Sequence, residues 1–140
     1  MSSIVPDLLP ADAAIVATLQ AALPGLQSVY RYGSAGGAFA RADSDVDLAV
    51  LANRPIPFDE LSRLTVELMR ISGSDVDLND MRRLPVTLRV QIVAEGCRLF
   101  AADVGTADEY AAHTLADYAR LNEERKFILN DVRRRGSIYG

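Results

Sequence analysis

The sequence predicts an α/β (α+β) fold in which a small mixed sheet of three to four strands is flanked by helices and followed by a long C-terminal helix. Three observations support this prediction. Segments with helical and strand-like patterns alternate along the chain, the strand-like segments are short, and the last third of the chain keeps one helical pattern throughout. There are no internal repeats or low-complexity linkers.

The first half of the chain is expected to contain one long helix and two strands. Residues 11–23 carry apolar side chains at helical spacing and end at a Pro-Gly pair, which stops a helix. Residues 26–32 (LQSVYRY) are rich in strand-forming side chains and end at Gly33, and residues 46–51 form a second apolar run. A short helix over residues 35–40 is expected between these two strands.

The second half is expected to contain three more helices and two short strands. Residues 58–71 place their leucines on one stripe and stop at a Ser-Gly pair, and residues 76–78 lie in a third strand. A helix opens at Pro85 and is closed by Gly96, and residues 97–100 form a short final strand. Residues from about 106 to 135 predict the long C-terminal helix.

Length and composition limit the functions that are expected. At 140 residues the chain is expected to form a single domain, and 49% hydrophobic with 24% charged residues is typical of a soluble globular protein. A net charge of −4 does not favour binding along a nucleic-acid backbone, so no direct nucleic-acid partner is expected. The lone Cys97 suits a reducing compartment and is expected to pack as an apolar residue. Without a secretory signal or an apolar run of ~18 residues, a cytoplasmic protein with no membrane partner is expected.

Two short segments alternate acidic and apolar residues, DVDLAV at 45–50 and DVDLND at 75–80. Alternate side chains of a strand share one face, so Asp45 and Asp47 point to the same side while their apolar neighbours point into the core. If the two strands are neighbours, Asp77 joins them and at least three carboxylates converge. Crowded carboxylates repel one another unless a cation such as Mg²⁺ lies between them. The pattern therefore predicts a magnesium site, with two ions as the expected number for phosphoryl-type chemistry.

A phosphate-binding turn is expected before the first pair of carboxylates. Gly33 permits a positive φ and lets the backbone approach a ligand closely. Ser34 opens the short helix expected over residues 35–40, so its hydroxyl lies beside exposed N–H groups that can bind an anion. The sequence thus predicts a turn that binds the terminal phosphates of a nucleotide. Ten residues after this turn it predicts two metal ligands.

Gly33-Ser34, ten residues and then Asp45-Val46-Asp47 reproduce the GSx10DxD signature, so the chain resembles the nucleotidyltransferases related to DNA polymerase β. With SDVDLND at residues 74–80 and the LRVQIVAEGCRLF segment that follows, it is similar to the minimal nucleotidyltransferases, the MNT or MntA-like antitoxins found beside HEPN toxins. The resemblance covers residues 26–100 well and the terminal helices only by length and character. It implies the DNA polymerase β-like nucleotidyltransferase fold.

The resemblance also implies a role for each residue that matches the family pattern. Gly33 and Ser34 match the phosphate-binding pair, and Asp45 and Asp47 match two metal ligands that are also catalytic residues. Ser44 matches a serine that commonly precedes the first aspartate and is expected to help bind the nucleotide.

The resemblance implies a third catalytic carboxylate further along the chain. Asp77 lies where the family keeps it, as a metal ligand or as a general base for the acceptor hydroxyl, while Asp75 and Asp80 compete for this role. The chain departs from the family where a basic residue and a glycine often follow the serine, because it has Gly37-Ala38 there. Arg41 is expected to replace part of that missing charge at the nucleotide.

The function that the resemblance implies is that of an antitoxin in a type VII toxin–antitoxin system. Such a protein transfers AMP from ATP, with Mg²⁺, to a tyrosine of its cognate HEPN ribonuclease toxin and so neutralises it. Two alternatives stay open. One is a small-molecule nucleotidyltransferase of the antibiotic-modifying type, which would need a second subunit to complete its pocket. The other is a non-catalytic antitoxin that acts by binding alone.

Overall fold

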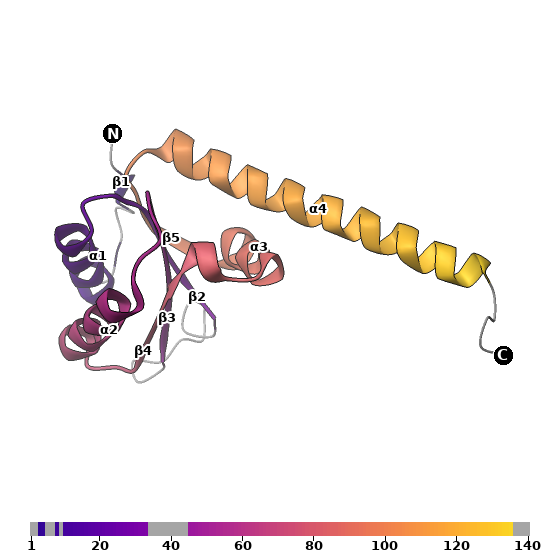
Figure 1. Ribbon diagram of the computed structural model, residues 1–140. Coiled ribbons are helices and arrows are strands. Elements are labelled where there is room, and N and C mark those ends of the chain that lie inside the picture. Colours follow the sequence, from indigo (N-terminus) through magenta and orange to yellow (C-terminus); the bar gives the residue numbers. More distant parts are fainter. Residues whose placement is uncertain (1–2, 5–7, 9, 34–44, 136–140) are drawn as a thin grey trace.

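The protein folds around one five-stranded sheet with helices on both faces (Figure 1). The computed structural model describes residues 3–4, 8, 10–33 and 45–135. In chain order, the described elements are β1 (Ser3–Ile4), α1 (Pro10–Ala22), β2 (Leu26–Tyr32), β3 (Val46–Ala52), α2 (Phe58–Ser72), β4 (Val76–Asp80), the 3₁₀ helix η2 (Met81–Arg83), α3 (Val86–Glu95), β5 (Cys97–Ala101) and α4 (Val104–Arg134).

The strand order is β1-β5-β2-β3-β4. The pair β3–β4 is parallel and the other three pairs are antiparallel, which makes the sheet mixed. The predicted mixed sheet, the flanking helices and the long C-terminal helix are confirmed. The fifth strand is the two-residue β1, which pairs Ser3 with Ala101 at the edge of β5 and is too short to leave a sequence pattern.

Each face of the sheet packs against its own helices. Figure 1 shows α1 and α2 on one side of the sheet and α3 on the other, with the first part of α4 beside α3. The larger apolar core joins α1 and α2 to residues such as Leu48 and Val50 of β3. The smaller core lies on the α3 side and contains Tyr30, Ala49, Leu51, Met81 and Ile92. Alternate residues of β3 therefore serve different cores, as period-2 patterning requires.

Element ends follow local chemistry. The sequence-predicted strand over residues 26–32 is confirmed at both ends, and α2 stops where Gly73 adopts a left-handed φ of 69° and its N–H donates to the Met69 carbonyl. The last helix begins at Val104, two residues earlier than expected, because the Asp103 carboxylate accepts from the Thr106 N–H (2.9 Å) and caps it. The short helix expected over residues 35–40 lies outside the described residues.

The expectation that Cys97 packs as an apolar residue is wrong, because its side chain is exposed. Cys97 is the first residue of β5, at the point where the chain leaves α3. Burial along this strand begins only at Leu99 and continues through Phe100 and Ala101.

The helix α4 extends well beyond the rest of the protein (Figure 1). Over its 31 residues only Ala107 and Thr114 are fully buried, and both belong to its first half. Among the described residues, no helix combines the length and the apolar character that crossing a membrane demands.

Candidate active site

Two carboxylates meet where the parallel strands β3 and β4 begin. The register pairs Asp47 of β3 directly with Asp77 of β4, so the two acidic strands are neighbours and the condition for the expected convergence is met. Asp45 is exposed and lies one residue before β3, two positions from Asp47. The three carboxylates that the sequence singled out therefore come to one end of the sheet.

This acidic group lies on the α3 side of the sheet. Val46 and Leu48 are buried in the core under α1 and α2, so Asp47 between them faces the other way. On that face Tyr32 is the cross-strand neighbour of Asp47, and its hydroxyl oxygen accepts a hydrogen bond from the Asn79 side-chain amide (3.0 Å). Sequence reasoning missed this bond, although Asn79 shares its strand face with Asp77.

Burial and the repulsion between neighbouring carboxylates both raise pKa values in the site. Burial raises the pKa of Asp47 above its ordinary value, and the charges of Asp77 and then Asp45 raise it further. Burial also raises the pKa of the Tyr32 hydroxyl, against the lowering effect of the Asn79 bond, and the charges of Asp77 and Asp47 add to the rise. Tyr32 is thus a neutral phenol at neutral pH, and a cation beside these carboxylates would relieve their repulsion.

Both the backbone conformation at position 33 and the nearby Asp47 carboxylate require a glycine there. Its φ of 74° lies in the left-handed region, which side chains with a Cβ rarely adopt. A Cβ built on Gly33 would lie 2.3 Å from Asp47 Oδ2, so the aspartate carboxylate occupies the space that only glycine leaves open. Gly33 therefore lies directly against the Asp47 carboxylate.

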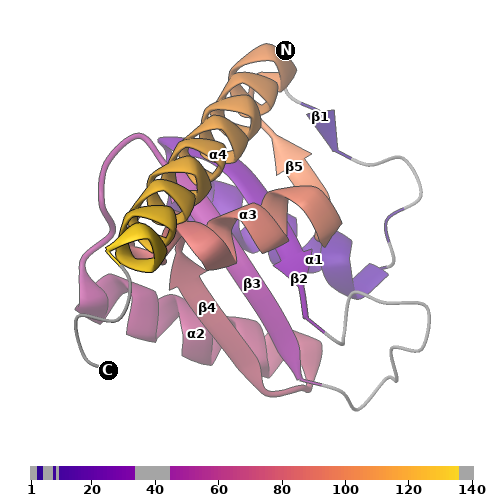
Figure 2. The same cartoon turned by 90° about the vertical axis from the view of Figure 1, so that its right-hand side faces the viewer.

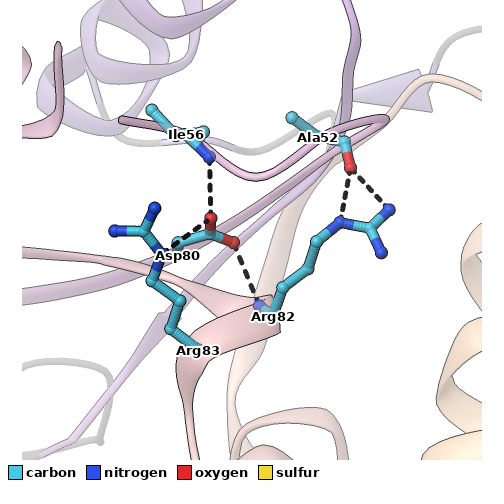
Figure 3. Close-up of polar contacts among 5 residues, drawn as sticks. All are labelled: Ala52, Ile56, Asp80, Arg82 and Arg83. Carbon is cyan, nitrogen blue, oxygen red and sulfur yellow. Dashed lines mark hydrogen bonds and ion pairs between the residues drawn. The ribbon is translucent and has the colours of Figure 1, made fainter. Parts of the chain in front are cut away.

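The geometry favours Asp77 over its two competitors as the third carboxylate. Asp75 is exposed and lies before β4, and it does not contribute to the raised pKa of Asp47. Asp80 is fully buried at the far end of the strand (Figure 3). Its carboxylate accepts from the backbone N–H groups of Ile56 (2.9 Å) and Arg82 (3.0 Å) and lies 3.9 Å from Arg83 Nε. Asp80 holds the loop before α2 against η2 and takes no part in the acidic group.

The remaining sequence-predicted site residues fall outside the described residues. They are Ser34, Arg41 and Ser44, and the Gly37-Ala38 pair of the same segment lies there too.

The described carboxylates fit a magnesium site that is completed by a substrate. Within the part of the chain that the structure describes, no three acidic, His or Cys side chains lie close enough to hold one ion between them. Mg²⁺ does not need such a set, because it usually takes one or two carboxylates together with substrate phosphates and water. Asp47 and Asp77 provide such a pair, with Asp45 beside them, and burial followed by the charge of Asp77 raises the pKa of Asp47.

A pocket of about 360 Å³ opens next to the acidic group. It lies between the end of β2 and the last turns of α3 and is lined by Arg31, Tyr32, Gly33, Leu88, Gln91, Ile92, Glu95 and Gly96. Sequence reasoning did not predict it, because its two walls are separated by more than fifty residues. Its volume is in the range of small-molecule sites.

The amino-acid sequence is similar to a known family and to individual known proteins. The profile of the family described as "Polymerase beta, Nucleotidyltransferase" matches residues 14–104. The protein adenylyltransferase MntA of Shewanella oneidensis is 35% identical over 121 residues, which cover 84% of each chain. A spectinomycin 9-adenylyltransferase of Staphylococcus aureus is 40% identical over 60 residues, which are 43% of this chain and 23% of that enzyme.

Solved structures give the same picture. One is the tri-AMPylated HEPN toxin of Shewanella oneidensis in complex with an MNT antitoxin, matched with a TM-score of 0.71 and 30% identity over 87% of this chain and 95% of that one. Another is a toxin–antitoxin structure with AMP-PNP, matched with a TM-score of 0.74 and 33% identity over 86% of this chain and 97% of that one.

Proposed function

The chain belongs to the polymerase beta family of nucleotidyltransferases, and from that premise we propose that it is the adenylyltransferase antitoxin of a HEPN toxin, within a type VII system. It transfers AMP from ATP to a tyrosine hydroxyl of the toxin and thereby neutralises it. The observation that carries the proposal is the pairing of Asp47 with Asp77 across β3 and β4, directly beside the Gly33 turn. The likeness to an MNT antitoxin solved with a tri-AMPylated HEPN toxin supports the choice of acceptor.

In this proposal Asp77 has two tasks, metal binding and proton transfer, and each other site residue has one. Gly33 and Ser34 bind the phosphates of ATP, and Ser44 and Arg41 assist them. Asp45 and Asp47, with Asp77, hold magnesium, for which we propose two ions. Magnesium, when bound, supplies the positive charge that stabilises the α-phosphate and the departing pyrophosphate.

The transfer itself needs positioning and one proton acceptor. The tyrosine oxygen forms a bond to the α-phosphorus of ATP while the bond from that phosphorus to the β-phosphate oxygen breaks, so pyrophosphate leaves. Asp77 accepts the proton of the tyrosine hydroxyl. Asp77 is suited to this because it is exposed at the start of β4, on the face that Asp47 shares.

The direct test is the mass of the toxin after incubation with the purified chain, ATP and Mg²⁺. We expect the mass to rise by one or more AMP groups, on a tyrosine, and to stay unchanged when EDTA removes the metal. A toxin that keeps its mass with ATP and Mg²⁺ present contradicts the proposal.

A small-molecule acceptor is the second candidate, favoured by the 60-residue match to a spectinomycin 9-adenylyltransferase. The chain spans only 23% of that enzyme's length, so the match does not include most of the enzyme. Pyrophosphate release that depends on an aminocyclitol antibiotic and proceeds without toxin would identify this activity.

Gly33→Ala is expected to lower the rate of AMP transfer about 10- to 100-fold. The new Cβ would displace the Asp47 carboxylate, whose Oδ2 lies 2.3 Å from its position, and would strain a backbone with a φ of 74°. Initial rates of toxin modification at saturating ATP measure the effect.

Gly73→Ala is the matched control for this substitution. Gly73 has nearly the same φ, 69°, but no atom of the described residues lies within 4 Å of a Cβ built there. Both variants should lose about 1 kcal/mol of stability from backbone strain, while Gly73→Ala should keep the wild-type transfer rate. Equal rates in the two variants would show that contact with Asp47 does not matter.

A further inference from the structure

The side of α4 that packs on the body continues as an apolar stripe past the last turn that α3 covers. Ala107 and Thr114 are buried there, and Tyr110 packs against the core cluster that contains Ile92. Residues three and four apart share one side of a helix. By that spacing the same side carries Ala107, Tyr110, Thr114, Tyr118, Leu121, Arg125, Ile128 and Val132.

The side chains of this stripe become more exposed to solvent toward the C-terminal end of the helix. Tyr118 and Leu121 are half-buried, whereas Ile128 is 61% and Val132 62% exposed. Ile128 and Val132 are two of the nine large hydrophobic side chains that are exposed among the described residues. Apolar side chains gathered in this way mark an interaction surface more often than scattered ones do.

The region where α4 leaves α3 has a second feature of a binding surface. A hollow of about 520 Å³ lies there, lined by Val86, Arg89, Asp117, Arg120, Leu121 and Glu124. Arg89 Nε is buried and, in the described part of the chain, has no hydrogen-bond partner. The Arg89 side chain as a whole is only half-buried and lines the hollow, so its charge is open to an acidic group of a bound protein.

The direction of α4 indicates what binds there. Figures 1 and 2 show α4 projecting from the sheet on its α3 side, the side that also carries Asp47 and Asp77. A protein held along the stripe therefore lies on the same side as the acidic group. A transferase that modifies a protein needs such a surface to hold its substrate near the reacting groups.

We propose that the stripe formed by Leu121, Ile128 and Val132, together with the Arg89 hollow, is the docking surface for the toxin that receives AMP. This inference rests on the proposed function and adds the place where the protein substrate binds. The three- and four-residue spacing of the stripe suits a helix of the toxin packed lengthwise against α4.

The test uses the full chain with Ile128→Asp and Val132→Asp combined. Both side chains are exposed, so the double variant should fold. We expect its Kd for the toxin, measured by calorimetry without ATP, to rise about 30-fold or more. In transfer assays KM for the toxin should rise likewise, while kcat at saturating toxin stays within about twofold. The conservative pair Ile128→Leu and Val132→Leu should restore wild-type affinity.

Phe127→Asp is the matched control. Phe127 is 73% exposed on the same helix, but its side chain points about 100° away from Ile128 and about 140° away from Val132 around the helix axis. Its Kd for the toxin should change by less than about threefold.

Separate binding and transfer measurements distinguish the two proposals. Unchanged toxin affinity in the double variant overturns the docking surface and leaves the proposed function intact. A double variant that loses only self-association, seen by light scattering, also overturns it, because the stripe then binds a second copy of this chain. Toxin binding through the stripe without any AMP transfer by the wild-type chain upholds the docking surface and rejects the proposed function.

Discussion

Asp47→Asn is expected to slow AMP transfer to the toxin about 1000-fold and to leave the affinity for the toxin unchanged. The amide keeps the shape of the side chain but carries no charge, so it loses the attraction for magnesium beside Asp77. The loss corresponds to about 4 kcal/mol of transition-state stabilisation. Initial rates of AMP incorporation, together with toxin affinity by calorimetry, measure the two expectations separately.

Asp75→Asn is the control for this prediction. Asp75 is exposed just before β4, and it is not among the charges that raise the pKa of Asp47, so its rate should stay within about threefold of wild type. Full activity of Asp47→Asn would reject its role at the metal. If Asp45→Asn and Asp47→Asn add no AMP yet protect cells from the toxin as well as wild type does, the chain neutralises by contact alone.

Asp80→Ala is expected to lower the free energy of unfolding by about 3 kcal/mol. The substitution leaves the buried Ile56 N–H and the Arg82 N–H without their acceptor and removes the carboxylate that faces Arg83 (Figure 3). Since domains of this size have only about 5–15 kcal/mol of stability, the effect is large. The midpoint and slope of urea unfolding give the change.

Asp75→Ala is the matched control for the stability measurement, because it removes an exposed carboxylate just before the other end of the same strand. Its unfolding free energy should change by no more than about 0.5 kcal/mol. At a temperature where the Asp80→Ala variant remains folded, the transfer rate of the Asp80→Ala variant should be close to that of wild type. A large loss of kcat in that folded protein would return Asp80 to the list of catalytic candidates.

Much of the site could be predicted because the alternation of acidic and apolar residues along a strand shows which side chains share one face of the sheet. The alternation at residues 45–50 and 75–80 was enough to place Asp47 and Asp77 on one side, and the register pairs them. The same alternation could also have excluded Asp80 from the site. Asp80 shares its strand face with Val76 and Leu78, which are buried under α1 and α2, so its position already pointed away from the acidic group.

Other features depend on contacts between distant parts of the chain and leave no local pattern. The Tyr32–Asn79 bond joins residues 47 positions apart, and the strand β1 has only two residues. The helical pattern of α4 was visible in the sequence, but the point at which α3 stops covering it was not. The cap at Asp103 was a readable signal, since an aspartate before a helix commonly binds the N–H three residues on.

The parallel pairing of β3 with β4 has a consequence for how the enzyme is built. Neighbouring strands are held ~4.8 Å apart by their ladder of backbone hydrogen bonds, so the separation of Asp47 and Asp77 is set by the main chain. Little conformational entropy remains to be lost there when a ligand arrives, because folding has already ordered both backbones. The acidic pair is thus preorganised, and changes in loops or in α4 can alter what is recognised without altering the spacing of these two carboxylates.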